Sequence, residues 1–232
     1  MRLEYTAISD RGLVRETNED ALLVGNQILR DDSDSFGFDI PADGIVFPAI
    51  VCDGVGGNHR GEEASMTACD EMRKVTESLD RNMSENDLIL RLKQDVAHCN
   101  NIILEKAAGC GMATTLTGLI VLGERALVLN AGDSRTYRLR YDNFKQLTHD
   151  HAADSDGRRV ITNCLGLDDV TLDVTATAIV PDDIFIVCSD GLFDMISDEL
   201  IAANASSADR LLQLALEAGG HDNISIITLK FF

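Results

Sequence analysis

The feature that most limits how this chain can fold is an apolar run that ends in an aspartate and a cluster of glycines. Residues Ile45 to Cys52 predict a buried strand, Asp53 follows directly, and Gly54, Gly56 and Gly57 allow a tight turn. A helical pattern begins at residue 61. A carboxylate followed by bare backbone carbonyls is suited to a hard cation, although the same pattern is typical of an ordinary strand–loop–helix connection.

Helices and strands are expected along the whole chain. Apolar residues recur every three or four positions at 64–79, 88–103 and 211–216, which predicts three helices. Ser84 and Asp87 form a capping pattern at the start of the second helix. Alternating or continuous apolar residues predict strands at 3–8, 21–24, 45–52, 113–122, 126–130, 136–140, 144–147, 171–178, 184–188 and 224–231. This order indicates an α+β fold in which helices cover a sheet-on-sheet core, without repeats or linkers.

The acidic segment 30–44 is rich in residues that break regular structure. Its Asp-x-Ser-Asp pattern resembles part of a calcium-binding loop, but the spacing and the closing glutamate of an EF-hand are missing. We therefore expect a solvated loop here.

Composition narrows the possible partners and compartment. The formal charge is −19, from 39 acidic and 20 basic residues, so the surface should repel a phosphate backbone and nucleic acid is not expected as a partner. The six cysteines include Cys52 and Cys188 inside apolar strands, which is typical of small buried side chains in a reducing compartment. No apolar run approaches the ~18 residues needed to span a bilayer. We expect a cytoplasmic protein without a signal peptide.

Three aspartates share one sequence context. Asp53, Asp190 and Asp222 each lie beside an apolar strand and next to a glycine or asparagine. Because buried unpaired carboxylates are costly, the three are expected to converge on shared positive charge. An oxygen-only donor set favours Mg²⁺ or Mn²⁺ over Zn²⁺. Two such ions, ~3.5–4 Å apart, orient a water and lower its pKa for attack on phosphorus. Arg15 supplies a guanidinium that can hold phosphate oxygens.

Eight short motifs, in a fixed order over nearly the whole chain, resemble those of the metal-dependent (type 2C) serine/threonine protein phosphatases in their compact bacterial form. Each motif alone is weak, whereas eight in order are specific. They are Arg15-x-x-Asn-Glu-Asp20, Val51-Cys-Asp-Gly-Val-Gly-Gly57 with Gly61-Glu-x-Ala-Ser65, Thr114-Thr115, Gly132-Asp-Ser-Arg135, Leu147-Thr-x-Asp-His151, Val160-Ile-Thr-x-x-Leu-Gly166, Cys188-Ser-Asp-Gly-Leu192 and Gly219-Gly-x-Asp-Asn223.

The resemblance implies a fold and a set of residue roles. The fold is a four-layer α-β-β-α sandwich with two central, mostly antiparallel sheets, built as a single catalytic domain over residues 1–232. The metal site lies at one end of the sheets. By resemblance, Asp53 bridges two metal ions, and Asp190 and Asp222 complete the coordination of the first ion. The Gly54 carbonyl binds the second ion, and Glu19 and Asp20 hold the second ion or its waters. Asp133, with Asp190, holds a weaker third ion, and Arg15 binds phosphate. As a less favoured alternative, Asp133 caps its turn, and Asp20 can support the metal ligands without touching the ion.

The chain departs from the family in two places. Val55 stands where eukaryotic relatives carry a histidine, and His59 lies one place after the histidine of bacterial relatives, so no general acid is assigned and His59 is expected at the surface. A long flap normally precedes the Val-Ile-Thr motif, but here only Ala152–Gly157 intervene. The flap is nearly absent, and we expect a tight connection and an open site.

These features predict hydrolysis of phosphoserine and phosphothreonine in proteins by a water activated at a binuclear Mg²⁺ or Mn²⁺ centre. The expected partners are a phosphorylated protein substrate and a cognate serine/threonine kinase, and the expected state is a monomer. Two alternatives stay open. One is a catalytically inactive metal-binding regulatory module of the same fold, and the other is a phosphatase for small phosphoesters or for one dedicated partner.

Overall fold

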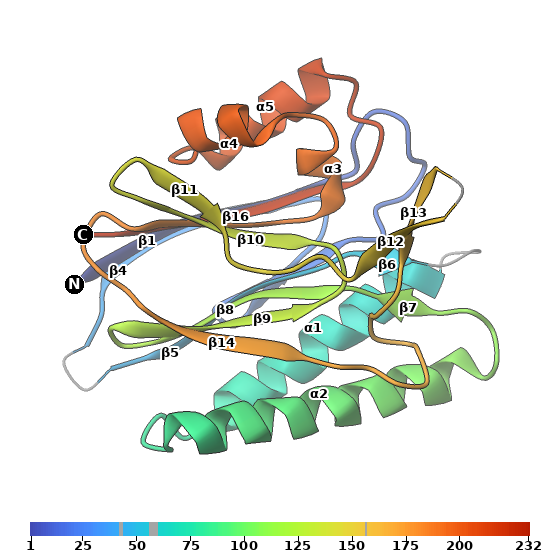
Figure 1. Ribbon diagram of the computed structural model, residues 1–232, viewed down its shortest axis with the longest axis horizontal. Coiled ribbons are helices and arrows are strands. Elements are labelled where there is room, and N and C mark those ends of the chain that lie inside the picture. Colours follow the sequence, from blue (N-terminus) through green and yellow to red (C-terminus); the bar gives the residue numbers. More distant parts are fainter. Residues whose placement is uncertain (42–43, 56–59, 156) are drawn as a thin grey trace.

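Two antiparallel sheets lie face to face at the centre of the molecule, with helices on both outer faces (Figure 1). The computed structural model describes residues 1–41, 44–55, 60–155 and 157–232. The expected turn at Gly56 and Gly57 and the expected surface position of His59 lie outside the described residues. The arrangement confirms the predicted α+β fold with four layers.

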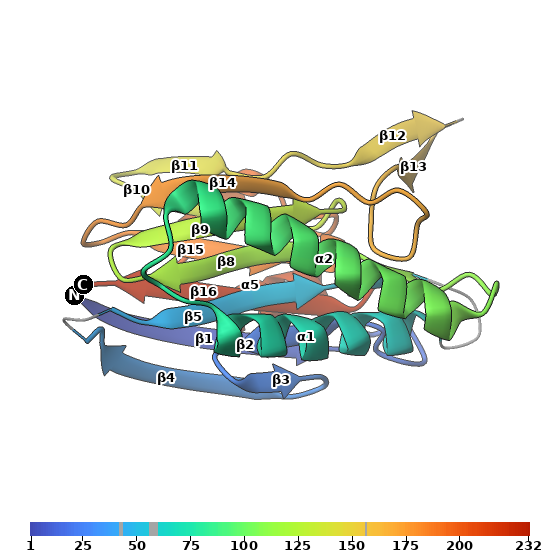
Figure 2. The same cartoon turned by 90° about the horizontal axis from the view of Figure 1, so that it is seen from below.

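Sheet A has the strand order β11-β10-β15-β16-β1-β4. Its strands are β1 (Arg2–Asp10), β4 (Ser33–Asp39), β10 (Arg135–Arg140), β11 (Asn143–Gln146), β15 (Ile184–Cys188) and β16 (Ile224–Phe231). The first and last strands of the chain are neighbours, with Leu3 opposite Phe231. The two termini consequently lie side by side, as Figures 1 and 2 show.

Sheet B has the strand order β14-β9-β8-β5-β2-β3. Its strands are β2 (Ala21–Val24), β3 (Gln27–Leu29), β5 (Val46–Cys52), β8 (Leu116–Leu122), β9 (Arg125–Ala131) and β14 (Asp173–Ala178). Two short two-stranded pairs lie at one end of the large sheets. They are β6 (Gly54–Val55) with β7 (Ala113–Thr114), and β12 (Ala152–Ser155) with β13 (Arg158–Ile161).

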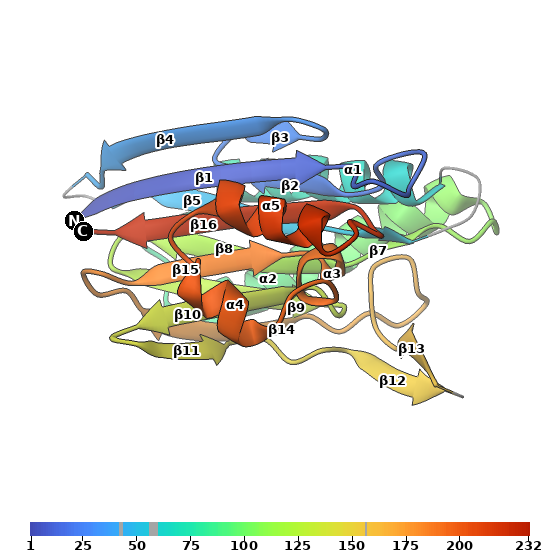
Figure 3. The ribbon, with the colours of Figure 1, turned by 90° about the horizontal axis from the view of Figure 1, so that it is seen from above.

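The two long helices cover sheet B (Figure 2). They are α1 (Arg60–Ser78) and α2 (Glu85–Ala107), close to the predicted ranges. The predicted cap of α2 is confirmed, because the Ser84 hydroxyl accepts a hydrogen bond from the backbone N–H of Asp87 at 3.2 Å. On the other side, α4 (Asp198–Ala203) and α5 (Ala208–Glu217) lie over sheet A, and the single turn α3 (Asp190–Phe193) follows β15 (Figure 3).

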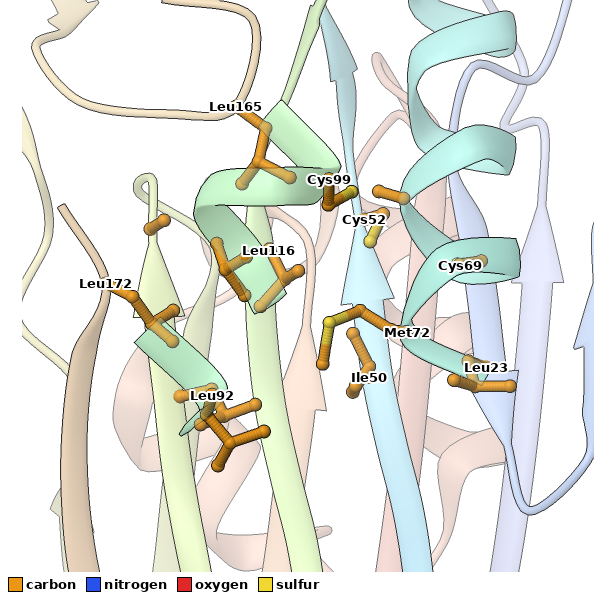
Figure 4. Close-up of a cluster of buried hydrophobic side chains, with 14 of the residues drawn as sticks. Leu23, Ile50, Cys52, Cys69, Met72, Leu92, Cys99, Leu116, Leu165 and Leu172 are labelled. Carbon is orange, nitrogen blue, oxygen red and sulfur yellow. The ribbon is translucent and has the colours of Figure 1, made fainter. Parts of the chain in front are cut away.

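Three apolar layers hold these elements together. One lies between the sheets, one between sheet A and the short helices, and one between sheet B and the long helices. Figure 4 shows the last of these, where Ile50 and Cys52 of β5 lie opposite Cys69 and Met72 of α1. The cysteines are free and, apart from the exposed Cys110, buried, and burial raises the pKa of the Cys99 thiol to about 12. These thiols therefore serve as packing groups, as the sequence indicated.

The expectation of a loop at 30–44 is wrong for its middle part, because β4 pairs with β1 along the edge of sheet A. An edge strand is paired on one side only and tolerates charged residues, so its composition does not look like that of a strand. Phe38 packs on Phe47, with ring centroids 5.5 Å apart, and the Tyr5 hydroxyl donates to Asp34 at 2.5 Å. These contacts bind an acidic segment to the core.

The expectation of a tight connection at 152–157 also needs correction. Ala152–Ser155 and Arg158–Ile161 form the antiparallel strands β12 and β13, which extend beyond the end of the main sheets (Figure 3). The chain after His151 therefore makes a short hairpin with its own ladder of hydrogen bonds.

None of the helices in the described part of the chain has the length and apolar character that a membrane-spanning helix needs.

Candidate active site

A cavity of about 370 Å³ is lined in part by residues of β6, β13 and α3. These three elements lie near one end of the large sheets (Figure 1). Seven of the eight predicted site residues line the cavity. They are Arg15, Glu19, Asp53, Gly54, Asp133, Asp190 and Asp222, and the wall is completed by Val55, Arg159, Ile161, Asp194 and Asn223. Residues from six separate stretches of the sequence therefore meet in one place.

The backbone of Asp53 is hydrogen-bonded to Thr115, the residue between β7 and β8. Its backbone N–H donates to the Thr115 hydroxyl at 3.0 Å, and its carbonyl accepts from the Thr115 N–H at 2.9 Å. A Cβ at Gly54 would collide with the carbonyl oxygens of Gly61 and Glu19. Glycine at 54 thus lets the first turn of α1 and the segment before β2 close in on the aspartate.

Asp222 and Asn223 fix the loop between β1 and β2. The Arg15 guanidinium donates to the Asp222 carboxylate at 2.6 Å. The Asn223 side chain donates to the carbonyls of Arg11 and Thr17 at 2.9 and 3.0 Å and accepts from the Glu19 N–H at 2.8 Å. Asn223 is buried and belongs to the Gly-Gly-x-Asp-Asn motif, but no local pattern indicated a role for it. Its contacts set where Arg15 and Glu19 stand.

Asp190 begins α3 directly after β15. The neighbouring Gly191 lies so close to the Asn223 carbonyl that a Cβ there would collide with it. Ser189 joins the same structure, because its hydroxyl donates to the Asp20 carboxylate at 2.9 Å and accepts from the Ser225 N–H at 3.0 Å. Asp20 is 1% exposed and does not line the cavity. The structure therefore places Asp20 behind the cavity wall.

The chain matches the family model described as protein phosphatase 2C over residues 25–224. This match spans most of the sequence. The chain belongs to the protein phosphatase 2C family.

Curated relatives and solved structures of this family resemble the chain over most of its length. The serine/threonine protein phosphatase PstP of Mycobacterium tuberculosis is 31% identical over 97% of the chain, which spans only 44% of that relative. The serine/threonine phosphatase stp of Listeria welshimeri is 25% identical, with 96% of the chain and 93% of the relative covered. The crystal structure of the PstP catalytic domain with two manganese ions has a TM-score of 0.79 at 29% identity and 99% coverage of both chains.

The electrostatics of this protein phosphatase 2C domain fit a cation site. Burial, and then the neighbouring carboxylates Asp20, Asp190 and Asp222, raise the pKa of Asp53 well above its usual range. Burial and Asp222 likewise raise the pKa of Asp190 to about 7. The charged forms of these groups are stabilised by positive charge nearby, and oxygen-only ligands suit Mg²⁺ or Mn²⁺. The donors present therefore fit the divalent ions of the family.

The carboxylates line the cavity, but in the described residues they do not form a complete set of side-chain metal ligands. Among the residues that the structure describes, no group of three or more Asp, Glu, His or Cys side chains stands in position to hold a metal ion. One oxygen of Asp222 is engaged by Arg15.

Arg159, on β13, lines the cavity but was not among the predicted site residues. Its Nε atom lies 3.0 Å from the Asp133 carboxylate, and its Nη2 atom lies 2.7 Å from that of Asp150. Asp133, the predicted ligand of a third ion, is thus paired with a cation of the chain. No motif pointed to Arg159, because the recognised Val-Ile-Thr motif begins one residue later.

Proposed function

We propose that this chain hydrolyses phosphoserine and phosphothreonine in proteins with the help of bound Mg²⁺ or Mn²⁺. The observation that carries the proposal is the convergence of Asp53, Asp190, Asp222 and Arg15 on one cavity. Carboxylates for metal and a guanidinium for phosphate are the two kinds of group that this reaction needs. The family membership and the manganese-bound relative support the same assignment.

Each side chain has a distinct task in this proposal. Asp53 would be shared between two ions, with Asp190 and Asp222 on the first and the Gly54 carbonyl on the second. Glu19 would hold the second ion. Asp20, which does not line the cavity, would act indirectly through its hydrogen bond with Ser189. When bound, the ions supply positive charge and lower the pKa of a water for in-line attack on phosphorus. No nucleophilic serine or cysteine is required.

Arg15 would bind and orient the phosphate. Among its contacts with described residues, only the Nη2 atom donates to Asp222, so its other N–H groups remain for phosphate oxygens. The Asp222 contact would hold the guanidinium in place. A planar, fixed guanidinium binds a phosphate dianion through two hydrogen bonds, which orients as well as attracts it.

The remaining predictions belong to the same proposal. Residues 1–232 would act as one catalytic domain and as a monomer on phosphorylated protein substrates, with a cognate kinase as the source of those substrates. Two ions would be bound. A third ion at Asp133 would have to share that carboxylate with Arg159.

The test is phosphate release from a phosphothreonine peptide with Mn²⁺ present and then with excess chelator. We expect turnover that chelator abolishes and that Asp53→Asn lacks while keeping a folded circular dichroism spectrum. Manganese binding without turnover on any phosphopeptide would support the inactive regulatory module instead. Turnover of a chromogenic phosphate ester without turnover of phosphopeptides would support the small-substrate enzyme. Full activity in chelator would contradict a metal-dependent reaction.

A further inference from the structure

A second guanidinium besides that of Arg15, from Arg159, lines the acidic cavity. The Arg159 side chain is surrounded by carboxylates from three different segments. Its Nε atom is 3.0 Å from Asp133, its Nη2 atom is 2.7 Å from Asp150, and its Nη1 atom is 3.7 Å from Asp194. The Nη2 atom also donates to the backbone carbonyl of Asp133 at 3.2 Å. Each of the three guanidinium nitrogen atoms therefore has a carboxylate within 4 Å.

Phe193 and Arg135 lie next to the Arg159 guanidinium and help to fix its position. The Arg159 guanidinium carbon lies 5.1 Å from the centre of the Phe193 ring, and that of Arg135 lies 3.9 Å from the same centre. Arg135 also binds Asp150, with its Nη2 atom 2.8 Å from the carboxylate. Asp150 is therefore shared by two arginines that meet one aromatic ring. Such a network restricts where the Arg159 side chain can lie.

The carboxylate it contacts most directly is nearly inaccessible. The Asp133 side chain is 4% exposed, whereas that of Arg159 is 32% exposed. A buried carboxylate needs a compensating charge, and either a guanidinium or a divalent ion can supply it. Arg159 engages the Oδ2 atom of Asp133, so a divalent ion on this carboxylate would lie beside the guanidinium and compete with it for the same negative charge. Occupation by one therefore weakens the other.

We propose that Arg159 is a built-in cation that fills the Asp133 side of the cavity and so limits divalent ions to the positions around Asp53. The hairpin β12–β13 would then set how many ions the site takes, because it carries this side chain. The inference rests on the proposed metal centre. The inference goes beyond that centre, because it assigns control over the number of bound ions to Arg159, which is not itself a metal ligand.

The experiment is equilibrium dialysis of the full chain against increasing Mn²⁺, with bound manganese measured per chain. Arg159→Met keeps most of the side-chain length and removes the charge. We expect this variant to bind one more Mn²⁺ than the wild type, at concentrations at least about tenfold lower than any further binding by the wild type. Asp133→Asn in the same background should remove the gained ion. Arg159→Lys should stay near the wild-type number and remains informative if the methionine variant does not fold.

Arg210→Met is the matched control, because Arg210 lies on α5, outside the cavity wall, with its Nη1 atom 3.7 Å from Glu217. It removes one positive charge far from the cavity and should leave the count unchanged. Equal counts for wild type and Arg159→Met, or loss of one ion from the wild type on Asp133→Asn alone, would overturn the inference while leaving the proposed function standing. A wild type that binds no Mn²⁺ would overturn both.

Discussion

At the scale of single residues, Arg15 links the two parts of the proposed chemistry, because it is the proposed phosphate-binding residue and donates to Asp222, a proposed metal ligand. Arg15→Ala should lower kcat/KM on a phosphothreonine peptide about ten- to a hundredfold, mainly through KM. The loss of a charged hydrogen bond to a dianion is worth roughly 1.5–3 kcal/mol. Steady-state kinetics at fixed Mn²⁺ measures the effect.

The control for this prediction is stability. The Arg15 side chain is 51% exposed, and exposed ion pairs contribute little, so the melting temperature should change little in the alanine variant. Arg15→Lys should recover part of the affinity, since it keeps the charge but not the two-pronged geometry. Unchanged kinetics with unchanged melting would show that Arg15 is a solvated loop residue.

The residues that the sequence located and those that it missed differ in a physical way. Asp53, Asp190 and Asp222 each follow or precede an apolar strand, so their positions at a sheet end could be inferred locally. The contact between Arg159 and Asp133 spans 26 positions and depends on how a short hairpin folds back. Local patterns do not contain that information. The metal roles of all these residues stay predictions.

At the scale of elements, periodic helices and continuous apolar strands were predictable, whereas β4 and β12–β13 were not. The long helices bury a regular stripe, and that stripe is visible in the sequence. β4 is an edge strand with exposed acidic positions, and the hairpin β12–β13 is mostly exposed. Elements that bury little apolar surface show little periodic pattern of apolar residues in the sequence, so they are hard to predict from it.

The contact between α1 and the segment after β5 gives a prediction at this scale. Gly54→Ala would push a methyl group against backbone carbonyls of Gly61 and Glu19, which cannot rotate away. We expect a loss of about 1–3 kcal/mol in the free energy of unfolding and a marked fall in turnover, because Asp53 adjoins the strain. Urea unfolding and phosphopeptide kinetics measure both.

Gly111→Ala serves as the comparison, since an added Cβ there has no atom within 4 Å. It should leave both the urea midpoint and the turnover close to wild type. If Gly54→Ala were equally harmless, the close approach of these backbones would not be what positions Asp53.

At the scale of the whole molecule, we expect the acidic cavity to couple metal binding to stability. Mn²⁺ should raise the melting temperature progressively, because an ion that binds the folded state adds about 2.7 kcal/mol per site at a hundred times its dissociation constant. Differential scanning calorimetry over a Mn²⁺ series tests this. The response should be much reduced in Asp53→Asn. A wild-type melting curve indifferent to millimolar Mn²⁺ would contradict the proposed centre.

The net charge of −19 should also influence substrate choice. Basic phosphopeptides should show a higher kcat/KM than neutral ones, and the advantage should shrink with added salt, since the Debye length is about 8 Å near physiological ionic strength. Peptides that differ only in neutral flanking residues should react similarly. A strong, salt-insensitive preference among those peptides would instead indicate that the hairpin β12–β13 or another part of the rim reads the sequence around the phosphate.

The pairing of the first and last strands has a mechanical consequence. Leu3 lies opposite Phe231, so opposite pulls on the two ends would load the hydrogen bonds between β1 and β16 one pair at a time. These bonds run across the strands, in the direction of such a pull. Strands loaded in this way peel apart progressively, whereas strands pulled along their length must break many bonds together. Stretched by its ends, the molecule should yield at low force, beginning at the terminal end of the β1–β16 pair.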